Sequence, residues 1–221
     1  RKHGTVTLYD AGTKIEVTQT RVDLTTDGRH ATVAFKRDWI ADASRRDFTI
    51  NAIYLDESGK IFDPLGGRED LRKGRLRFAG DTKSRIFEDA LRIIRYCRFL
   101  PRFGWGEEDK ETQNVLRENA HLCLGLSGER IASELRQIMI GNGAIRVIDF
   151  MSAANIDQAI VGVKFKLISV SAPPVIEALL CKYGWLTVLA AVIPVGSGPQ
   201  VAERLKLSRK EERCLIRLDI G

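Results

Sequence analysis

The feature that most constrains the fold is a change of sequence pattern near residue 80. Before it, short runs that alternate β-branched or apolar residues with polar ones are separated by turn residues, as in strands joined by hairpins. After it, turn residues become rare and apolar residues recur at helical spacing. The sequence therefore predicts an α+β fold, in which a small mixed or antiparallel sheet is followed by a mainly α-helical region.

The expected strands are short. In chain order they cover residues 5–9, 14–20, 53–55, 60–62 and 75–78. Turn residues separate the first two strands and also the next two, so each of these pairs is a predicted hairpin. In the helical region, Ser208 with Glu211 three residues later has the spacing of a capping box and predicts a helix start. Domain boundaries are expected near 80–84 and, where two prolines interrupt the pattern, near 171–174.

Composition and charge limit the classes of function. Hydrophobic residues make up 44% and charged residues 29% of the chain, which excludes a disordered protein, and no run of about 20 apolar residues predicts a membrane span. The formal net charge is +6, and residues 71–102 alone carry ten Lys or Arg against three acids, or +7. Such a segment favours anionic partners, either nucleic acid or nucleotide phosphates.

The cysteines and histidines are isolated along the chain. The four cysteines form no C-x-x-C pair, and the three histidines lie far from one another. This spacing argues against a zinc site and against a disulfide framework, and it predicts cysteines that behave as small buried hydrophobes. We expect a reducing, cytoplasmic setting; the sequence predicts no oligomeric state.

Residues 85–102 are expected to form one helix with two different faces. At about 100° per residue the apolar residues gather on one side, whereas the charged residues gather on the other. The predicted packing face consists of Phe87, Ala90, Ile93, Ile94, Cys97 and Leu100. On the charged side, Asp89, Arg92, Arg95 and Arg98 are spaced three residues apart, and three arginine forks in a row suit a polyphosphate.

Two interpretations of the Asp89 and Arg92 pair are open at this point. The carboxylate offers acceptors and the guanidinium offers donors, a combination that complements the mixed edge of a nucleobase. The alternative is an ordinary ion pair on a helix surface, worth about 0.2–0.5 kcal/mol. Two more segments stand out. Residues 45–52 begin with two arginines and then alternate the apolar residues Phe48, Ile50 and Ala52 with other residues. In residues 63–71, Gly66 and Gly67 predict a tight turn into a short helix.

Taken in order, these segments resemble the class II tRNA nucleotidyltransferases, the family of CCA-adding enzymes and bacterial poly(A) polymerases. The resembling blocks are residues 3–7, 16–21, 27–30, 45–52, 63–71, 88–92 and 204–208, with a weaker stretch at 127–135. The resemblance implies a partial nucleotidyltransferase head at 1–80, a helical neck with a nucleotide-reading helix at 81–170 and a helical body that binds tRNA at 171–221.

The resemblance also implies the activity and the residues that perform it. The family extends tRNA 3′ ends with CTP and ATP and uses no nucleic-acid template. The residues that match its nucleotide contacts are Arg46, Asp89, Arg92, Arg95 and Arg98, and Asp89 with Arg92 match its base-reading pair. Such a site rejects GTP and UTP because a wrong base leaves buried donors and acceptors unpaired. The open alternatives are an A-adding enzyme or poly(A) polymerase, and a catalytically inactive RNA-binding module.

One part of the family pattern is missing from the sequence. The family head begins with a Gly-rich loop and an Asp-x-Asp pair that binds two magnesium ions, and this sequence has no Asp-x-Asp. Two-metal chemistry needs such carboxylates, so we expect the Mg²⁺ ligands to come from an N-terminal segment that this chain lacks. No metal ligand and no catalytic residue is therefore assigned here. Glu16, on a predicted strand, is expected to be a surface or structural residue and not a metal ligand.

Overall fold

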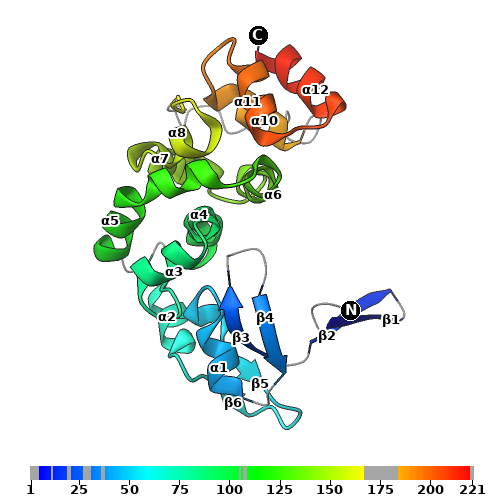
Figure 1. Ribbon diagram of the computed structural model, residues 1–221, viewed down its shortest axis with the longest axis vertical. Coiled ribbons are helices and arrows are strands. Elements are labelled where there is room, and N and C mark those ends of the chain that lie inside the picture. The colour runs from blue at the N-terminus through cyan, green and yellow to red at the C-terminus, as the bar shows by residue number, and fades with distance from the viewer. Residues whose placement is uncertain are drawn as a thin grey trace.

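The computed structural model describes residues 5–10, 12–18, 21–26, 31–35, 38–104, 106, 109–166 and 184–219. Figure 1 shows a curved molecule with the strands toward one end and the C-terminal helices at the other. The α+β fold is confirmed: three short hairpins are followed by helices that share one core. No helix among these residues is long and apolar enough to cross a membrane.

The strands form three separate antiparallel pairs. They are β1 (Thr5–Asp10) with β2 (Thr13–Thr18), β3 (Arg21–Thr26) with β4 (Ala31–Phe35), and β5 (Tyr54–Leu55) with β6 (Ile61–Phe62). The first and third pairs confirm the two predicted hairpins, and the second was not predicted. The expected strand at 75–78 is wrong, because the described residues there form only an isolated bridge between Phe48 and Phe78.

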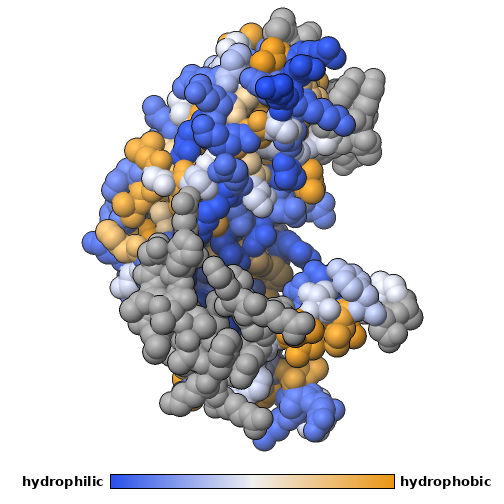
Figure 2. Space-filling model, turned by 45° about the vertical axis from the view of Figure 1, so that its right-hand side comes forward, coloured by the Kyte–Doolittle hydropathy of each residue, from blue (hydrophilic) through white to orange (hydrophobic). Residues whose placement is uncertain are grey.

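The first hairpin has one apolar face. Val6 pairs with Val17 and Leu8 with Ile15, so the four side chains lie on the same side of β1 and β2. Each is between 42% and 54% exposed. Figure 2 shows this face as hydrophobic colour on the projecting part of the surface. The opposite face carries Glu16, which forms an ion pair with Lys14 and is therefore a surface residue of the hairpin, as expected.

The helical segments are eleven in the described residues, and two short 3-10 turns accompany them. The helices are α1 (Trp39–Ser44), α2 (Gly67–Lys73), α3 (Thr82–Glu88), α4 (Leu91–Phe103), α5 (Lys110–Glu118), α6 (Gly128–Met139), α7 (Ala144–Ala153), α8 (Ile156–Val161), α10 (Trp185–Val192), α11 (Gly198–Leu205) and α12 (Arg209–Asp219). The 3-10 turns are η1 (Thr49–Asn51) and η2 (Ala120–Gly125). The core runs from the strand-proximal aromatic residues through α4 and α6 to α12.

The prediction of a single helix over residues 85–102 is wrong. Helix α3 ends at Glu88, α4 begins at Leu91, and Asp89 between them is extended, with φ −156° and ψ 104°. The Asp89 Oδ1 atom accepts the Leu91 N–H at 3.1 Å, so the side chain satisfies the start of α4 in place of a preceding helical turn. The break also turns Phe87 outward, where it is 61% exposed instead of facing the core.

The predicted packing face of α4 is confirmed beyond the break. Ile93, Ile94, Cys97 and Leu100 are fully buried. Among the other cysteines, Cys123 is buried and Cys214 half-buried, whereas Cys181 lies outside the described residues, as does the expected boundary at 171–174. The Ser208 capping box is also confirmed, since the Glu211 carboxylate accepts the Ser208 N–H at 3.1 Å and the Ser208 hydroxyl accepts the Glu211 N–H at 3.4 Å.

A pairing of two short segments joins the strand-bearing part to α4. The Thr49 N–H donates to the Arg77 carbonyl and the Ala79 N–H donates to the Asp47 carbonyl, each at 3.0 Å. Phe48 lies in this pairing, fully buried, with its ring centroid 5.0 Å from that of Phe78. The alternating pattern at 45–52 therefore marks a core segment, and it fixes where the neighbouring Asp47 lies.

Asp70 is the buried acid that organises this region. Its side chain is fully buried, and it accepts hydrogen bonds from the Thr49 hydroxyl at 2.6 Å, from Arg75 Nη2 at 2.6 Å and from Arg77 Nε at 3.1 Å. Burial acts to raise the pKa of Asp70, but the hydrogen bonds from Thr49, Arg75 and Arg77 outweigh it and hold the pKa below its ordinary value. Arg75 and Arg77 therefore stabilise the fold through their contacts with the buried Asp70.

The glycine pair begins α2 as predicted. Gly66 has φ +75°, and the Asp63 carboxylate accepts the Gly67 N–H at 2.8 Å. A Cβ on Gly67 would lie 2.3 Å from the Thr49 carbonyl oxygen, so no larger residue fits between α2 and η1. Gly67 thus sets the distance between these two elements.

Replacement of Gly67 by Ala should lower the free energy of unfolding by about 1–3 kcal/mol, because the added methyl group would overlap backbone atoms that cannot move independently. Urea unfolding checks this. Gly125→Ala is the matched control, since a Cβ there meets nothing within 4 Å, and its effect should stay within about 0.5 kcal/mol. Equal stabilities of the two variants would contradict the close-approach argument.

Replacement of Asp70 by Asn should lower the free energy of unfolding by about 3 kcal/mol, because it removes the buried charge that pairs with Arg75 and Arg77. The native pKa of Asp70 lies below the unfolded value, so its contribution is complete above about pH 4 and is lost as the pH falls through the native value.

Urea unfolding between about pH 2 and pH 7 tests this sign, and the variant should lose less stability in acid than the wild type. Glu57→Gln, at an exposed position, is the control and should keep the wild-type pH dependence. If the Asp70→Asn variant loses as much stability in acid as the wild type does, the proposed contribution of Asp70 is contradicted.

Candidate functional site

The three predicted arginines lie along α4 between two acids, the partly buried Asp47 and the buried Glu134. Arg92 and Arg95 both bind Asp47, which follows the predicted residue Arg46 in the chain. The Arg92 Nε donates to Asp47 Oδ1 at 2.9 Å, and the Arg95 Nη2 lies 2.8 Å from Oδ2. The structure thus brings the 45–52 segment and α4 together, as a shared site requires.

Arg92 is the most enclosed of the three arginines. Its side chain is 12% exposed, against 34% for Arg95 and 29% for Arg98. The Arg92 Nη1 also donates to Glu88 Oε2 and to the Arg85 carbonyl, each at 2.7 Å. Burial acts to lower the pKa of Arg92, but the hydrogen bonds to Asp47 and Glu88 raise it above its ordinary value. Arg92 is therefore permanently charged and held on several sides.

Asp89 does not pair with Arg92 through their side chains. Its Oδ2 accepts from Arg130 Nη2 at 2.7 Å, and its Oδ1 accepts the Leu91 N–H. The connection to Arg92 is through the backbone, because the Arg92 N–H donates to the Asp89 carbonyl at 3.1 Å. The interpretation as a simple surface ion pair between Asp89 and Arg92 is therefore wrong, and Asp89 is instead oriented by α6.

Arg98 forms its ion pair with an acid on a different helix, α6. The Arg98 Nε lies 3.0 Å from Oε2 of Glu134 on α6, and Glu134 is 8% exposed. Burial raises the pKa of Glu134 above its ordinary value even though Arg98 and Arg95 favour the charged form. Helix α6 therefore contributes two side chains to the site, Arg130 and Glu134, which are spaced i, i+4 on one face.

Arg46 faces a separate acid. Its Nη2 donates to Asp42 Oδ2 at 2.7 Å, and that oxygen also accepts from the Tyr54 hydroxyl at 2.9 Å. Burial acts to raise the pKa of Asp42, but the hydrogen bonds from Arg46, Arg45 and Tyr54 hold it below its ordinary value. About 40% of the Arg46 side chain is exposed.

A buried arginine links this group to the others. The Arg85 Nη2 donates to the carbonyls of residues 45 and 46 at 2.8 and 2.7 Å, which holds the end of α1 against α3. The structure thus brings four of the predicted residues, those at 89, 92, 95 and 98, into one network, and it connects Arg46 through its backbone. The network also includes residues that the sequence analysis did not single out: Asp47, Arg85, Glu88, Arg130 and Glu134.

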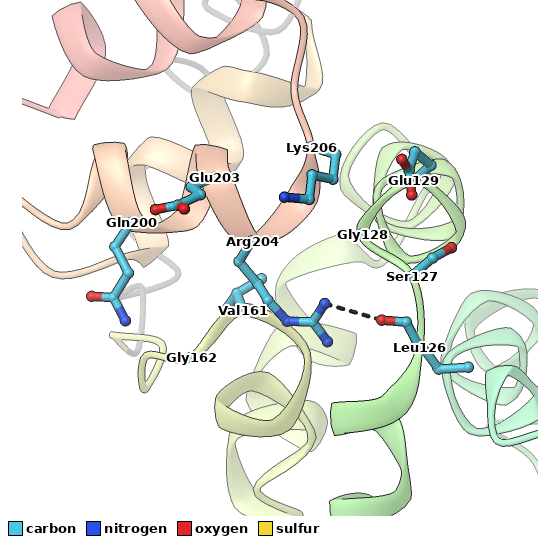
Figure 3. A pocket seen from close by; sticks show the side chains of 10 residues that line it. All are labelled: Leu126, Ser127, Gly128, Glu129, Val161, Gly162, Gln200, Glu203, Arg204 and Lys206. Carbon is cyan, nitrogen blue, oxygen red and sulfur yellow. Dashed lines mark hydrogen bonds between the residues drawn. The ribbon is translucent and has the colours of Figure 1, made fainter.

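A pocket of about 550 Å³ lies beside the N-terminus of α6 (Figure 3). It is lined by residues 126–129, by Val161 and Gly162, and by Gln200, Glu203, Arg204 and Lys206. Arg204 crosses it and donates to the Leu126 carbonyl at 3.0 Å. None of the five predicted site residues lines this pocket. It joins two of the blocks that carry the family resemblance, 127–135 and 204–208.

The described residues offer no metal centre. Among them, no group of three or more His, Cys, Asp or Glu side chains could hold a metal ion. The acids of the arginine network are each committed to guanidinium groups, so this part of the chain does not fit a two-metal site. What the network can do is present directed donors, from Arg95 and Arg98, beside an oriented carboxylate, Asp89.

Comparisons with known proteins agree with this architecture. Residues 1–77 match the family model of the poly A polymerase head domain. The human mitochondrial CCA tRNA nucleotidyltransferase 1 is 49% identical over 143 residues, which cover 64% of this chain and 33% of that protein. The CCA-adding enzyme of Geobacillus stearothermophilus is 35% identical over 167 residues, covering 75% of this chain and 41% of that one.

A solved structure extends the similarity into the helices. The CCA-adding enzyme of Bacillus stearothermophilus in complex with CTP superposes with a TM-score of 0.73 at 31% identity, over 96% of this chain and 52% of that one. The chain spans about a third to two fifths of the length of the curated relatives named above. Over most of its length this chain is therefore similar to the CCA-adding enzymes, and its residues 1–77 match the poly A polymerase head domain.

Proposed function

We propose that this chain acts in a template-independent nucleotidyltransferase that adds CCA to the 3′ end of tRNA from CTP and ATP. The observation that carries the proposal is the convergence of Asp89 with three arginines of α4 in a chain whose relatives are named CCA-adding enzymes. The CTP bound in the related Bacillus structure supports a nucleotide as the ligand.

Each residue has a proposed role that follows from its chemistry. Asp89 supplies acceptors and Arg92 supplies donors, and together they select the base edge of CTP or ATP. Arg95 and Arg98 contact the phosphates, because guanidinium forks can donate two hydrogen bonds to phosphate oxygens. Arg46 contacts the incoming nucleotide from the side of α1. GTP and UTP are rejected because they present the opposite donors and acceptors to a partly buried site.

The proposed partners and cofactor extend beyond these residues. The chain's basic character favours the tRNA 3′ end as the second substrate. A divalent ion, for which we propose Mg²⁺, would activate the attacking 3′-hydroxyl and stabilise the leaving pyrophosphate. Because the described residues do not fit a metal site, we assign its ligands to carboxylates outside them.

The division of the chain into head, neck and body is a prediction, and so is its cellular compartment. The head at 1–80, the neck at 81–170 and the body at 171–221 follow from the resemblance and the sequence pattern. We propose a cytoplasmic setting from the isolated cysteines; the human and zebrafish relatives are named mitochondrial.

Incorporation of nucleotides into a tRNA that lacks its 3′ CCA tests the proposed function. The assay supplies Mg²⁺ and each nucleotide singly or in pairs, with this chain alone and with the chain joined to the N-terminal segment of a curated relative. We expect the joined protein to add C with CTP and to complete CCA with CTP and ATP. Addition of A alone would indicate the A-adding or polyadenylating alternative, and RNA binding without incorporation by either protein would indicate the inactive RNA-binding module.

Replacement of Asp89 by Ala should relax base choice. The variant loses the oriented acceptor, so the preference for CTP and ATP over GTP and UTP should fall about tenfold or more, as expected when one hydrogen bond to a base edge is lost. Competition between the four nucleotides in the binding or incorporation assay measures this. An equal loss for all four nucleotides would contradict a base-reading role. Glu118→Gln, which removes an exposed acid on α5, serves as the control.

A further inference from the structure

The contact between Arg98 and Glu134 differs from the other pairs in the arginine network. Asp47, which lies between α1 and η1, accepts a hydrogen bond from Arg92 and forms an ion pair with Arg95. Glu134 instead comes from α6, and its side chain is 11% exposed. Arg98 is thus the one arginine of the row that the described structure ties to α6.

The geometry of this pair is also different. The Arg98 Nε and Glu134 Oε2 atoms are 3.0 Å apart, yet neither has a hydrogen-bond partner with acceptable geometry among the described residues. The pair is therefore held by charge at short range and not by an aligned hydrogen bond. Because Glu134 engages the Nε side, the two Nη groups of Arg98 stay available, and no hydrogen bond joins them to a described residue.

The surroundings leave Arg98 little freedom except at that fork. Its guanidinium carbon lies 4.7 Å from the centre of the Phe99 ring, which covers one face of the group. Its side chain is 29% exposed. Four residues before Glu134 on the same face of α6, Arg130 orients Asp89. One helix face therefore supports both ends of the row, the acid at 89 and the arginine at 98.

We propose that Glu134 is a positioning residue of the nucleotide site, which holds the Nε side of Arg98 so that its Nη fork points to the phosphates of the incoming nucleotide. The inference rests on the proposed function and deepens it, because it separates phosphate positioning through Glu134 from base selection through Asp89. A purely structural role in joining α4 to α6 would predict changes in stability without a specific change in nucleotide affinity.

A double-mutant cycle on nucleotide binding tests the proposal. Affinities of ATP and CTP are measured by titration calorimetry for the wild-type chain, Glu134→Gln, Arg98→Ala and the double variant. We expect Glu134→Gln to weaken ATP and CTP binding by the same factor, about tenfold, as for loss of one charged contact. In the double variant the loss should equal that of Arg98→Ala alone, because Glu134 acts through Arg98. Additive losses, or unchanged affinity in Glu134→Gln, would overturn the proposal.

Controls separate this result from a change in folding. Thermal unfolding of each variant is measured alongside, and Glu118→Gln removes an exposed acid elsewhere and should bind both nucleotides as the wild type does. If Glu134→Gln does not fold, Glu134→Asp takes its place in the cycle, with the same expectation that its effect disappears when Arg98 is Ala.

The proposed function and the positioning role of Glu134 can fail separately. If the wild-type chain binds no nucleotide, the proposed function and the positioning role both fail. If the wild type binds ATP and CTP and Glu134→Gln binds them equally well, only the positioning role fails. An effect on CTP but not on ATP would also overturn it, because a phosphate-directed arginine does not distinguish the two bases.

Discussion

The ion pairs of Asp47 with Arg92 and Arg95 are the interaction on which the rest of the site depends. Asp47 precedes the buried Phe48, and its own carbonyl accepts the Ala79 N–H, so the backbone fixes its position before the side chain engages α4. Two guanidinium groups are held by this one mostly buried carboxylate, so its loss would remove an acid partner from Arg95 and one of the two acid partners of Arg92. The strand-bearing part and α4 therefore share a single electrostatic anchor.

The break between α3 and α4 decides where the Asp89 carboxylate lies. A continuous helix would have carried Asp89 on the same face as the arginines, where a neighbouring guanidinium would have taken its carboxylate. In the extended conformation Asp89 instead binds Arg130 on α6 and the Leu91 N–H. Helical periodicity could not reveal the break, because apolar residues keep the same spacing across it. An Asp directly before an apolar run was the available signal, since it is a common helix-start residue.

Local features of the fold were predictable from the sequence, but the acids with which the arginines form ion pairs were not. Alternation and turn residues predicted two of the three hairpins, and period 3.6 predicted the buried side of α4, including Ile93 and Cys97. The strand expected at 75–78 has the right alternation, but Arg75 and Arg77 turn to Asp70, and only Phe78 pairs with another segment. The acids that hold the arginines were missed because they lie 36 to 48 residues away in sequence, as Glu134 lies from Arg98 and Asp47 from Arg95.

The arginines of residues 71–102 are consequently less available to an anionic ligand than the segment's net charge of +7 suggests. Its arginines at 75, 77, 92, 95 and 98 are each paired with an acid from outside the segment, namely Asp70, Asp47 or Glu134. An anionic ligand that offers only bulk charge gains little there, because it must compete with carboxylates that are already in place and mostly buried. In the proposed nucleotide site a triphosphate would gain more, since it would reach the donors that these acids leave open, above all the two Nη groups of Arg98. Selectivity in such a site comes from the direction of the remaining donors and not from net charge.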